Sequence, residues 1–219
     1  MPRSLPFEKH HRRYEDWFEQ HAAAYVSELL ALRPFVPYRG RGLEIGVGSG
    51  RFAAPLGVQV GIDPSPTMLT YAAGRGIETH IGTAESLPFG DDSFDYALVV
   101  TTICFVDSPR QMLTEAGRVL LPGGRLVIGF IDRESPLGRH YLANQEESVF
   151  YREATFFSAQ EVEGLLRDTG FVVESWAQTL RRPLAETVEI EAVKPGWGDC
   201  AFVVVAAVSD GSGPARAAP

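Results

Sequence analysis

Short apolar strands alternate with helical segments between residues 43 and 131, and this alternation limits the fold more than any other feature. Parallel neighbours in one sheet need crossover connections, so the alternation predicts βαβ units with helices on both faces of a sheet. The run Tyr96–Val100 is continuously apolar, as expected for a strand buried on both faces. The expected strands are Leu43–Ile45, Gln59–Ile62, Thr79–Ile81, Tyr96–Val100 and Arg125–Ile131, and the expected helices are Ser65–Gly74 and Pro109–Leu120.

Two further regions lie outside this alternation. Aromatic and apolar residues recur at helical spacing from Phe7 to about Leu32, which predicts one or two helices before the first strand. Residues 132–157 are polar, aromatic and irregular, and they predict an inserted loop or lid. After the insertion, Ser158 is placed to cap a further helix that Gly170 ends.

The last part of the chain is expected to complete the sheet. The segments Phe171–Leu180 and Ala201–Val208 have strand character, and no helical pattern lies between them. We therefore expect two strands that pair antiparallel at the sheet edge. The tail 210–219 is small and polar, which predicts disorder. Residues 1–209 are then expected to form a single α/β domain.

Composition narrows the classes of partner. The chain has 219 residues, a net charge of −8 and a pI near 5.2. It lacks the clustered Lys and Arg that nucleic-acid binding requires, and we interpret the pair Arg181–Arg182 as solvated surface. Cys104 and Cys200 lie in or beside apolar runs, which predicts buried thiols rather than a disulfide framework or a metal site.

The compartment is predicted from the same features. Two buried thiols suit a reducing compartment. No apolar run approaches the ~20 residues that a membrane span needs. The first residues, Met1-Pro2-Arg3-Ser4-Leu5, have no apolar signal core. We therefore expect a cytoplasmic protein without a membrane span or bound metal.

The first expected strand ends in a glycine loop, Glu44-Ile45-Gly46-Val47-Gly48-Ser49-Gly50. Glycines let the backbone approach a ligand closely. The spacing G-x-G-x-G differs from the G-x-G-x-x-G dinucleotide fingerprint, and an acid at Glu44 would repel a pyrophosphate. That acid suits a ligand with an ammonium group, and S-adenosylmethionine has both an ammonium and a sulfonium. A glycine-rich structural turn is the alternative interpretation.

Asp63 ends the second expected strand, 17 residues after Gly46. A carboxylate at this position can accept hydrogen bonds from both hydroxyls of a ribose. A capping aspartate before Pro64 is the structural alternative. Dinucleotide and adenosylmethionine sites share this spacing, so Asp63 does not separate them.

Three more segments follow at the ends or starts of successive strands: Gly82-Thr83-Ala84-Glu85-Ser86-Leu87-Pro88-Phe89, Ser93-Phe94-Asp95-Tyr96 and Leu121-Pro122-Gly123-Gly124-Arg125-Leu126. With the glycine loop and Asp63, they resemble the class I S-adenosylmethionine-dependent methyltransferases. The likeness is greatest to the small-molecule, type 11 branch that includes the quinone-biosynthesis C-methyltransferases. The resemblance covers roughly Gly40 to Phe171.

The resemblance implies a Rossmann-like, doubly wound sheet of seven strands, mostly parallel with an antiparallel last strand. It also implies an N-terminal helical cap at 7–38, an inserted lid at 132–157, and S-adenosylmethionine as the cofactor. Tyr14 and Trp17 resemble an aromatic pair that closes over the cofactor in this branch, and plain helix core is their alternative role. The other implied contacts are Glu44, Gly46 and Gly48 for the methionine portion, Asp63 for the ribose, Pro64, Met68, Ala84 and Glu85 for the adenine, and Thr101 and Thr102 for the methionine and the transferred methyl.

The sequence departs from the branch in three ways. Thr83 stands where the branch often has an aspartate, which shifts adenine recognition to Glu85 or the backbone. Only 12 residues separate Gly50 from Asp63, so the first crossover helix must be short. The branch often has a histidine after the fourth strand, whereas this chain has Thr102-Ile103-Cys104-Phe105-Val106.

Methyl transfer from a sulfonium is an in-line displacement, so the protein mainly aligns the reactants and excludes water. A general base is needed only where the acceptor must lose a proton. Arg133 and Arg139 are candidates to bind an acidic substrate, with surface positions as the alternative. Candidate bases are His21, Asp132, His140 and Tyr141, and candidate walls of an apolar pocket are Phe150, Tyr151, Phe156 and Phe157; packing or surface roles are the alternative for each.

The leading functional hypothesis is methyl transfer to a small-molecule acceptor by a monomer or homodimer. A nicotinamide-dependent oxidoreductase is one alternative, disfavoured by Glu44, the glycine spacing and the turn at residues 121–124. A non-catalytic adenosylmethionine-binding subunit is the other. The sequence leaves the acceptor and its reacting atom open.

Overall fold

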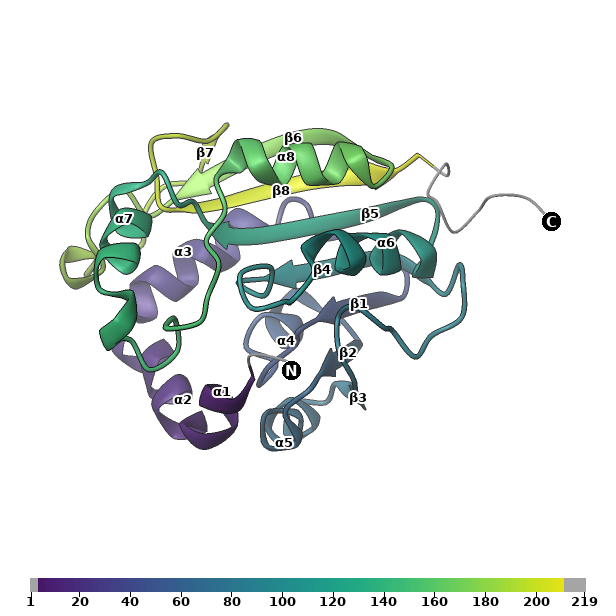
Figure 1. The fold of residues 1–219 in the computed structure, drawn as a ribbon, viewed down its shortest axis with the longest axis horizontal. Coiled ribbons are helices and arrows are strands. Elements are labelled where there is room, and N and C mark those ends of the chain that lie inside the picture. Colours follow the sequence, from purple (N-terminus) through teal and green to yellow (C-terminus); the bar gives the residue numbers. More distant parts are fainter. Residues whose placement is uncertain (1–3, 211–219) are drawn as a thin grey trace.

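A computed structural model describes residues 4–210, which form one eight-stranded sheet with helices on both faces (Figure 1). The predicted tail falls almost wholly outside these described residues. The strand order is β3-β2-β1-β4-β5-β8-β6-β7. The strands are β1 (Gly42–Ile45), β2 (Val60–Asp63), β3 (Glu78–Ile81), β4 (Phe94–Val100), β5 (Leu120–Ile131), β6 (Phe171–Thr179), β7 (Lys194–Pro195) and β8 (Phe202–Ser209).

The pairing confirms the predicted topology. Strands β1 to β5 pair in parallel, and β8 enters between β5 and β6 antiparallel to both. The expected count of seven strands omitted β7, which has two residues and pairs with β6 at the edge. Such a short segment carries no periodic pattern, so sequence alone could not show it.

The helices pack in two layers. The α-helices are α1 (Leu5–Lys9), α2 (His11–Gln20), α3 (Ala22–Leu32), α4 (Ala53–Leu56), α5 (Pro66–Gly74), α6 (Pro109–Val119), α7 (Pro136–Ala143) and α8 (Ala159–Asp168), with 3-10 turns η1 (Gln145–Glu147) and η2 (Leu184–Glu186). On β5, Leu126 and Ile128 face the core under α6 and α8, whereas Val127 faces the core under α3, α4 and α5. Each fully buried side chain of this kind contributes roughly 1.5–3 kcal/mol.

Local sequence signals explain where several helices begin. The Ser65 hydroxyl accepts a hydrogen bond from the Met68 amide at 3.2 Å, and Pro66 occupies the first turn of α5. Ser158 and Glu161 form a reciprocal capping box at the start of α8, a feature worth about 1 kcal/mol. The predicted short crossover is confirmed, because α4 has only four residues.

The insertion is more regular than predicted. Residues 132–157 were expected to be irregular, but they include α7 and η1. The Ser135 hydroxyl caps α7 by accepting from the Gly138 amide at 2.9 Å, and Pro136 opens the helix. The helix is only eight residues long and has two buried residues, Leu137 and Gly138, which is too little for a clear periodic pattern.

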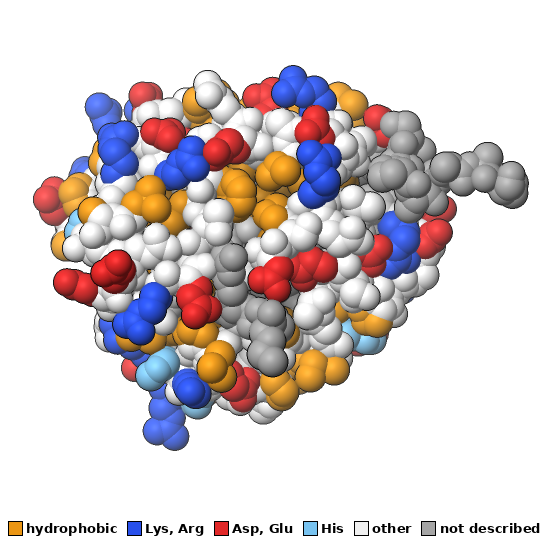
Figure 2. Space-filling model, in the orientation of Figure 1, with side chains coloured by type: hydrophobic (Ala, Val, Ile, Leu, Met, Phe, Trp, Pro, Cys, Tyr) orange, Lys and Arg blue, Asp and Glu red, His pale blue; other side chains and the backbone are white. Residues whose placement is uncertain are grey.

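The N-terminal helices and α7 gather at one end of the sheet, where β1, β4 and β5 have their carboxyl ends (Figure 1). Acidic and basic side chains are interspersed on the face that Figure 2 shows. Cys104 and Cys200 are buried, as predicted, and no disulfide joins them. Among the described residues, no helix combines the length and apolar character required to cross a membrane.

Candidate active site

A cavity of about 350 Å³ lies at the carboxyl ends of the parallel strands. It opens between β1 and β4, where the strand order reverses from β3-β2-β1 to β4-β5. Crevices at this point are the usual ligand sites of doubly wound sheets. One side is lined by the loops after β1, β2, β3 and β4, and the other by α2, α3, α7 and the segments near residues 150 and 180.

The glycine loop forms part of the cavity wall. Gly48 has a φ of +51°, and a Cβ added there would point between Tyr14 Oη at 3.5 Å and Met68 Cε at 3.6 Å. Gly46 has a φ of +73° and packs against Thr102, where an added Cβ would clash at 2.3 Å. The first glycine therefore fits the loop to β4, whereas the second brings the backbone to the cavity wall, where a Cβ would touch Tyr14 and Met68 without a clash.

Asp63 holds the glycine loop in place. Its Oδ2 accepts from the Gly48 amide and its Oδ1 from the Ser65 amide, both at 2.9 Å. Burial raises the pKa of this carboxyl to about 6, although both hydrogen bonds oppose the rise. The side chain lines the cavity, so remaining lone pairs are available to a ligand.

Glu44 lies beneath the loop and is not among the residues that line the cavity. Its side chain is 1% exposed, and Oε2 has no hydrogen-bond partner within residues 4–210. Burial raises the pKa of Glu44 well above its ordinary value, and the Ala53 amide opposes this rise by donating a hydrogen bond. The expected contact of Glu44 with the methionine portion, through water or directly, stays a prediction.

Ten of the other predicted cofactor residues also line this cavity, alongside Asp63. Glu85 has a second role, because its Oε1 accepts from the Asp107 amide at 2.8 Å and ties the loop after β3 to the start of α6. Thr101 has a φ of +49°, a conformation that β-branched residues rarely adopt. The ten are Tyr14, Trp17, Gly46, Gly48, Pro64, Met68, Ala84, Glu85, Thr101 and Thr102.

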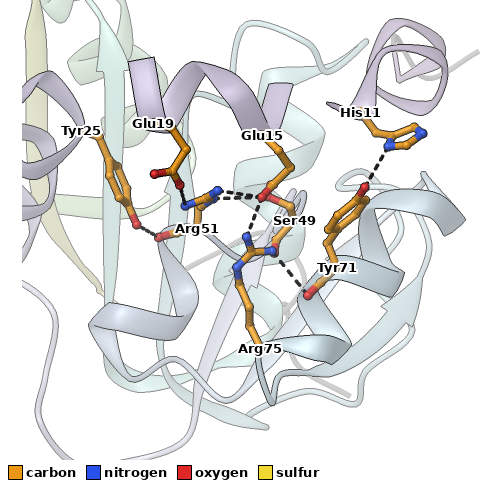
Figure 3. Close-up of polar contacts among 8 residues, drawn as sticks. All are labelled: His11, Glu15, Glu19, Tyr25, Ser49, Arg51, Tyr71 and Arg75. Atoms are coloured by element: carbon orange, nitrogen blue, oxygen red, sulfur yellow. Dashed lines mark hydrogen bonds and ion pairs between the residues drawn. The ribbon is translucent and has the colours of Figure 1, made fainter. Parts of the chain in front are cut away.

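Helix α2 is fastened to the glycine loop by a group of ion pairs (Figure 3). Glu15 lies between two arginines, with Oε2 at 2.9 Å from Arg51 and 2.6 Å from Arg75. Arg75 also donates to the backbone carbonyl of Ser49 at 2.8 Å, and the Tyr25 hydroxyl donates to the carbonyl of Arg51. We call Glu15, Arg51 and Arg75 the latch. No short-range motif in the sequence indicated it.

Aromatic rings complete the cover over the cavity. Phe7 in α1 packs against Phe105 after β4 and against Phe150 in the insertion, with ring centroids 5.0 Å apart in each pair. Tyr14 meets both Phe7 and Phe150 edge to face. The predicted wall therefore includes Phe150 and Tyr151, which line the cavity, whereas Phe156 and Phe157 are part of the protein core.

Two of the four candidate bases line the cavity. His21 stacks on Trp17 with ring centroids 5.1 Å apart, and its Nδ1 lies 3.1 Å from the Trp17 carbonyl. Tyr141 of α7 also lines it, and burial raises its pKa to about 12. These two candidates come from elements far apart in the sequence.

The other two candidate bases do not line the cavity. Asp132 turns the chain into α7 by accepting from the Glu134 amide at 2.9 Å. His140 is exposed on α7, beside Asn144. A helix of 3.6 residues per turn directs neighbouring residues about 100° apart, so Tyr141 faces the cavity and His140 faces solvent.

The predicted arginines for an acidic substrate also lie outside the cavity lining. Arg133 pairs with Glu134 at 3.3 Å and with Glu161 at 3.1 Å. Arg139 is exposed and donates to the Glu134 carbonyl at 2.5 Å. Both guanidinium groups therefore contact neighbouring groups at the surface rather than the cavity. This is the surface role that the sequence analysis gave as the alternative.

Glu28 of α3 was missed by the sequence analysis. It lines the cavity and is only 4% exposed. Its helix neighbours Ala24, Ala31 and Leu32 are all buried, so it belongs to the apolar stripe of α3. Leu30, an apolar residue of the same predicted helix, is instead 46% exposed. In the sequence, Glu28 lies four residues after Ala24, three before Ala31 and four before Leu32. This position among small and apolar residues was the available signal that Glu28 faces the core.

Comparisons with known proteins agree with this arrangement. Residues 43–128 match a methyltransferase domain family. An S-adenosylmethionine-dependent methyltransferase from Thermotoga maritima, described as a possible histamine N-methyltransferase, is 50% identical with a TM-score of 0.91, covering 94% of this chain and 99% of that one. An uncharacterized protein of Methanocaldococcus jannaschii is 42% identical, covering 92% of this chain and 97% of the relative. This chain therefore belongs to the class I S-adenosylmethionine-dependent methyltransferases.

Proposed function

We propose that this protein transfers a methyl group from S-adenosylmethionine to a small-molecule acceptor that binds in the same cavity. The observation that carries the proposal is the continuity of the cavity. The glycine-loop residues and the residues of α3 and α7 line one space of about 350 Å³. A donor on one side and an acceptor on the other would therefore meet without crossing solvent.

The residues on the strand side fit the proposed cofactor. Gly48 brings the backbone to the cavity wall, and Asp63 presents a carboxylate. We assign Gly46 and Gly48 to the methionine portion and Asp63 to the ribose hydroxyls. Met68, Ala84 and the backbone near them would pack at the adenine. Glu44 would act from beneath by supporting the loop.

S-adenosylmethionine supplies an activated methyl group on a sulfonium when it is bound. The chain's own residues then have to orient the acceptor and exclude water. Phe7, Tyr14 and Phe150 form an aromatic cover over the cavity, and the latch holds α2 against the glycine loop. These contacts support a role for the N-terminal helices as a lid over both ligands.

His21 is the candidate base that the geometry favours. Because the Trp17 carbonyl can only accept, the neutral ring carries its hydrogen on Nδ1. The other ring nitrogen, Nε2, is then the hydrogen-bond acceptor. We propose that Nε2 of His21 receives the proton where the acceptor is a hydroxyl or a thiol.

The two buried thiols support our proposal of a cytoplasmic location.

Calorimetry tests the cofactor assignment. We expect S-adenosylhomocysteine to bind with micromolar affinity and NAD to give no heat of binding. Binding of NAD alone would overturn the proposal. Mass spectrometry after incubation with S-adenosylmethionine and a panel of small amines, phenols, thiols and acids tests transfer. Tight cofactor binding with no methylated product across that panel would favour the non-catalytic alternative.

A further inference from the structure

Glu28 is a buried acid, and no partner among the described residues offsets the free-energy cost of burying its carboxyl. Within residues 4–210, its side chain has no hydrogen bond or ion pair. Burial raises its pKa to about 8, and no neighbouring cation opposes the rise. A buried carboxyl without a partner is rare in proteins because it loses hydration and gains nothing in return.

The groups near Glu28 come from several elements, and none is a cation. The charge of Glu28 contributes to the raised pKa values of four tyrosines, after burial as the main cause in each case. His21 lies seven residues earlier, at the turn between α2 and α3, and lines the same cavity. The four tyrosines are Tyr14 from α2, Tyr25 from α3, Tyr141 from α7 and Tyr151 from the insertion.

The remainder of this side of the cavity is apolar. Ile131, Leu137, Leu180 and Leu184 line it, and the hydroxyls of Tyr141 and Tyr151 have no hydrogen-bond partner in the described part of the chain. Arg13 of α2 is the one cation among the described lining residues. The part of the cavity around Glu28 therefore disfavours anions and favours a ligand that combines an apolar body with a positively charged hydrogen-bond donor.

We propose that Glu28 is the acceptor-recognition carboxylate, and that the acceptor is a small, partly apolar molecule bearing a protonated amine. This inference rests on the proposed methyltransferase function and specifies its acceptor. The ammonium would donate to the Glu28 carboxylate, while the apolar part packs against Leu137, Leu180 and Leu184. The ammonium would give the Glu28 carboxylate the ion-pair partner that the described residues do not provide.

Glu28 also controls the protonation state of the amine. An ammonium has no lone pair and cannot accept a methyl group, so one N–H proton has to leave first. That proton moves from the nitrogen to a Glu28 oxygen, which leaves a neutral amine and a neutral carboxylic acid. Glu28, with a pKa of about 8, and an alkylammonium, with a pKa near ~10, are close enough in strength for this exchange.

Binding of three probes of similar shape and different charge tests the proposal. Calorimetry at pH 7, on protein saturated with S-adenosylhomocysteine, compares 2-phenylethylamine, 2-phenylethanol and phenylacetate. We expect the amine to bind most tightly and phenylacetate not at all. In Glu28→Gln, the amine should lose about 10- to 100-fold in affinity. The matched control, Glu163→Gln on α8, lies outside the cavity and should bind like the parent protein.

The number of protons released when the amine binds distinguishes recognition by Glu28 from nonspecific binding. Calorimetric titrations in two buffers of different ionisation enthalpy measure this number. Because Glu28 is largely protonated at pH 7 and ionised beside an ammonium, amine binding should release close to one proton at pH 7. The release should decline towards pH 9, where Glu28 is already ionised. The alcohol should release none at either pH.

The two proposals fail in different ways. If S-adenosylhomocysteine does not bind, the methyltransferase proposal fails. If it binds but the amine shows no preference over the alcohol, or does not bind, the assignment of Glu28 is overturned while the cofactor site stands. Equal amine affinity in the parent protein and in Glu28→Gln also overturns it. Circular dichroism and the melting temperature of Glu28→Gln confirm that the variant is folded.

Discussion

The two sides of the cavity are built on different principles. The proposed cofactor side is made mainly of loops that directly follow β1 to β4, with a backbone conformation of positive φ at Gly46 and Gly48. The proposed acceptor side is made of helices and an insertion, with single side chains such as His21, Glu28 and Tyr141 on the lining. Most of the first comes from one stretch of the chain, whereas the second comes from several separate elements.

This difference determines what each side tolerates. Recognition by the backbone leaves little freedom, because any side chain at Gly48 would project between Tyr14 and Met68, two residues that line the cavity. Side-chain recognition can change one residue at a time while the sheet stays intact. The same scaffold can therefore keep its methyl donor and change its methyl acceptor. Four substitutions test whether the two sides of the cavity can be altered independently.

The largest effect is expected for Gly48→Val. The new side chain would enter the space between Tyr14 and Met68 from a backbone position with a φ of +51°. We expect S-adenosylhomocysteine affinity to fall at least about 100-fold. Calorimetry measures this, and an unchanged circular dichroism spectrum shows that the fold is retained. Binding within a few-fold of the parent protein would remove the glycine loop from the cofactor site.

The next effect is a pH-dependent gain in stability in Glu28→Gln. The folded-state pKa of Glu28, about 8, lies above the ordinary value of 4.5. The folded protein then holds more protons than the unfolded chain between these values, so stability falls as pH rises through this window. Removing the group should make the variant more stable than the parent by roughly 3 kcal/mol at pH 7, with almost no gain at pH 4.5.

Urea unfolding across this pH range measures the difference. Asp63 and Glu44 also have raised pKa values, but they are present in both proteins and cancel in the comparison. A constant difference between the variant and the parent at all pH values would contradict the assigned ionisation of Glu28.

Asp63→Ala should weaken S-adenosylhomocysteine binding by about 1–3 kcal/mol, the cost of lost hydrogen bonds in a site built around them. Part of the loss would come from the freed Gly48 amide, which the carboxylate holds at 2.9 Å. Asp63→Asn retains one acceptor and should lose less. Calorimetry compares the three proteins, and equal affinities would place Asp63 outside the cofactor site.

The smallest effect concerns the latch. Glu15→Gln should lower stability by roughly 1 kcal/mol, because Arg51 and Arg75 lose a half-buried charged partner. Cofactor affinity should fall only a few-fold, since the glycine loop keeps its bonds to Asp63. Glu19→Gln is the control, because Glu19 is 73% exposed and pairs with Arg51 alone. Equal melting temperatures for the two variants would contradict a role for the latch.

The same contrast explains what could be predicted from sequence. The fold and the cofactor side follow from local signals: strand and helix periods, the glycine loop, and capping residues such as Ser65 and Ser158. Eleven of the twelve predicted cofactor residues line the cavity, and Glu44 lies just beneath it. The periodicity that predicts a strand or helix needs only neighbouring residues.

The residues of the proposed acceptor side could not be predicted from such local patterns. Whether His140 or Tyr141 faces the cavity depends on the rotation of α7, which tertiary packing determines. Glu28 looked like an ordinary helical acid until the packing of α3 put it inside the protein. The latch joins residues 36 and 60 positions apart, so it has no local signature.

The turn between α2 and α3 has a consequence for the size of the proposed acceptor. Glu28 belongs to α3, whereas His21 is the residue with non-helical backbone angles that joins α2 to α3. The angle between the two helices therefore sets how far His21 lies from Glu28. A substitution that changed this angle would change the length of a molecule that can contact both groups, although every contact of the glycine loop with Asp63 stayed in place.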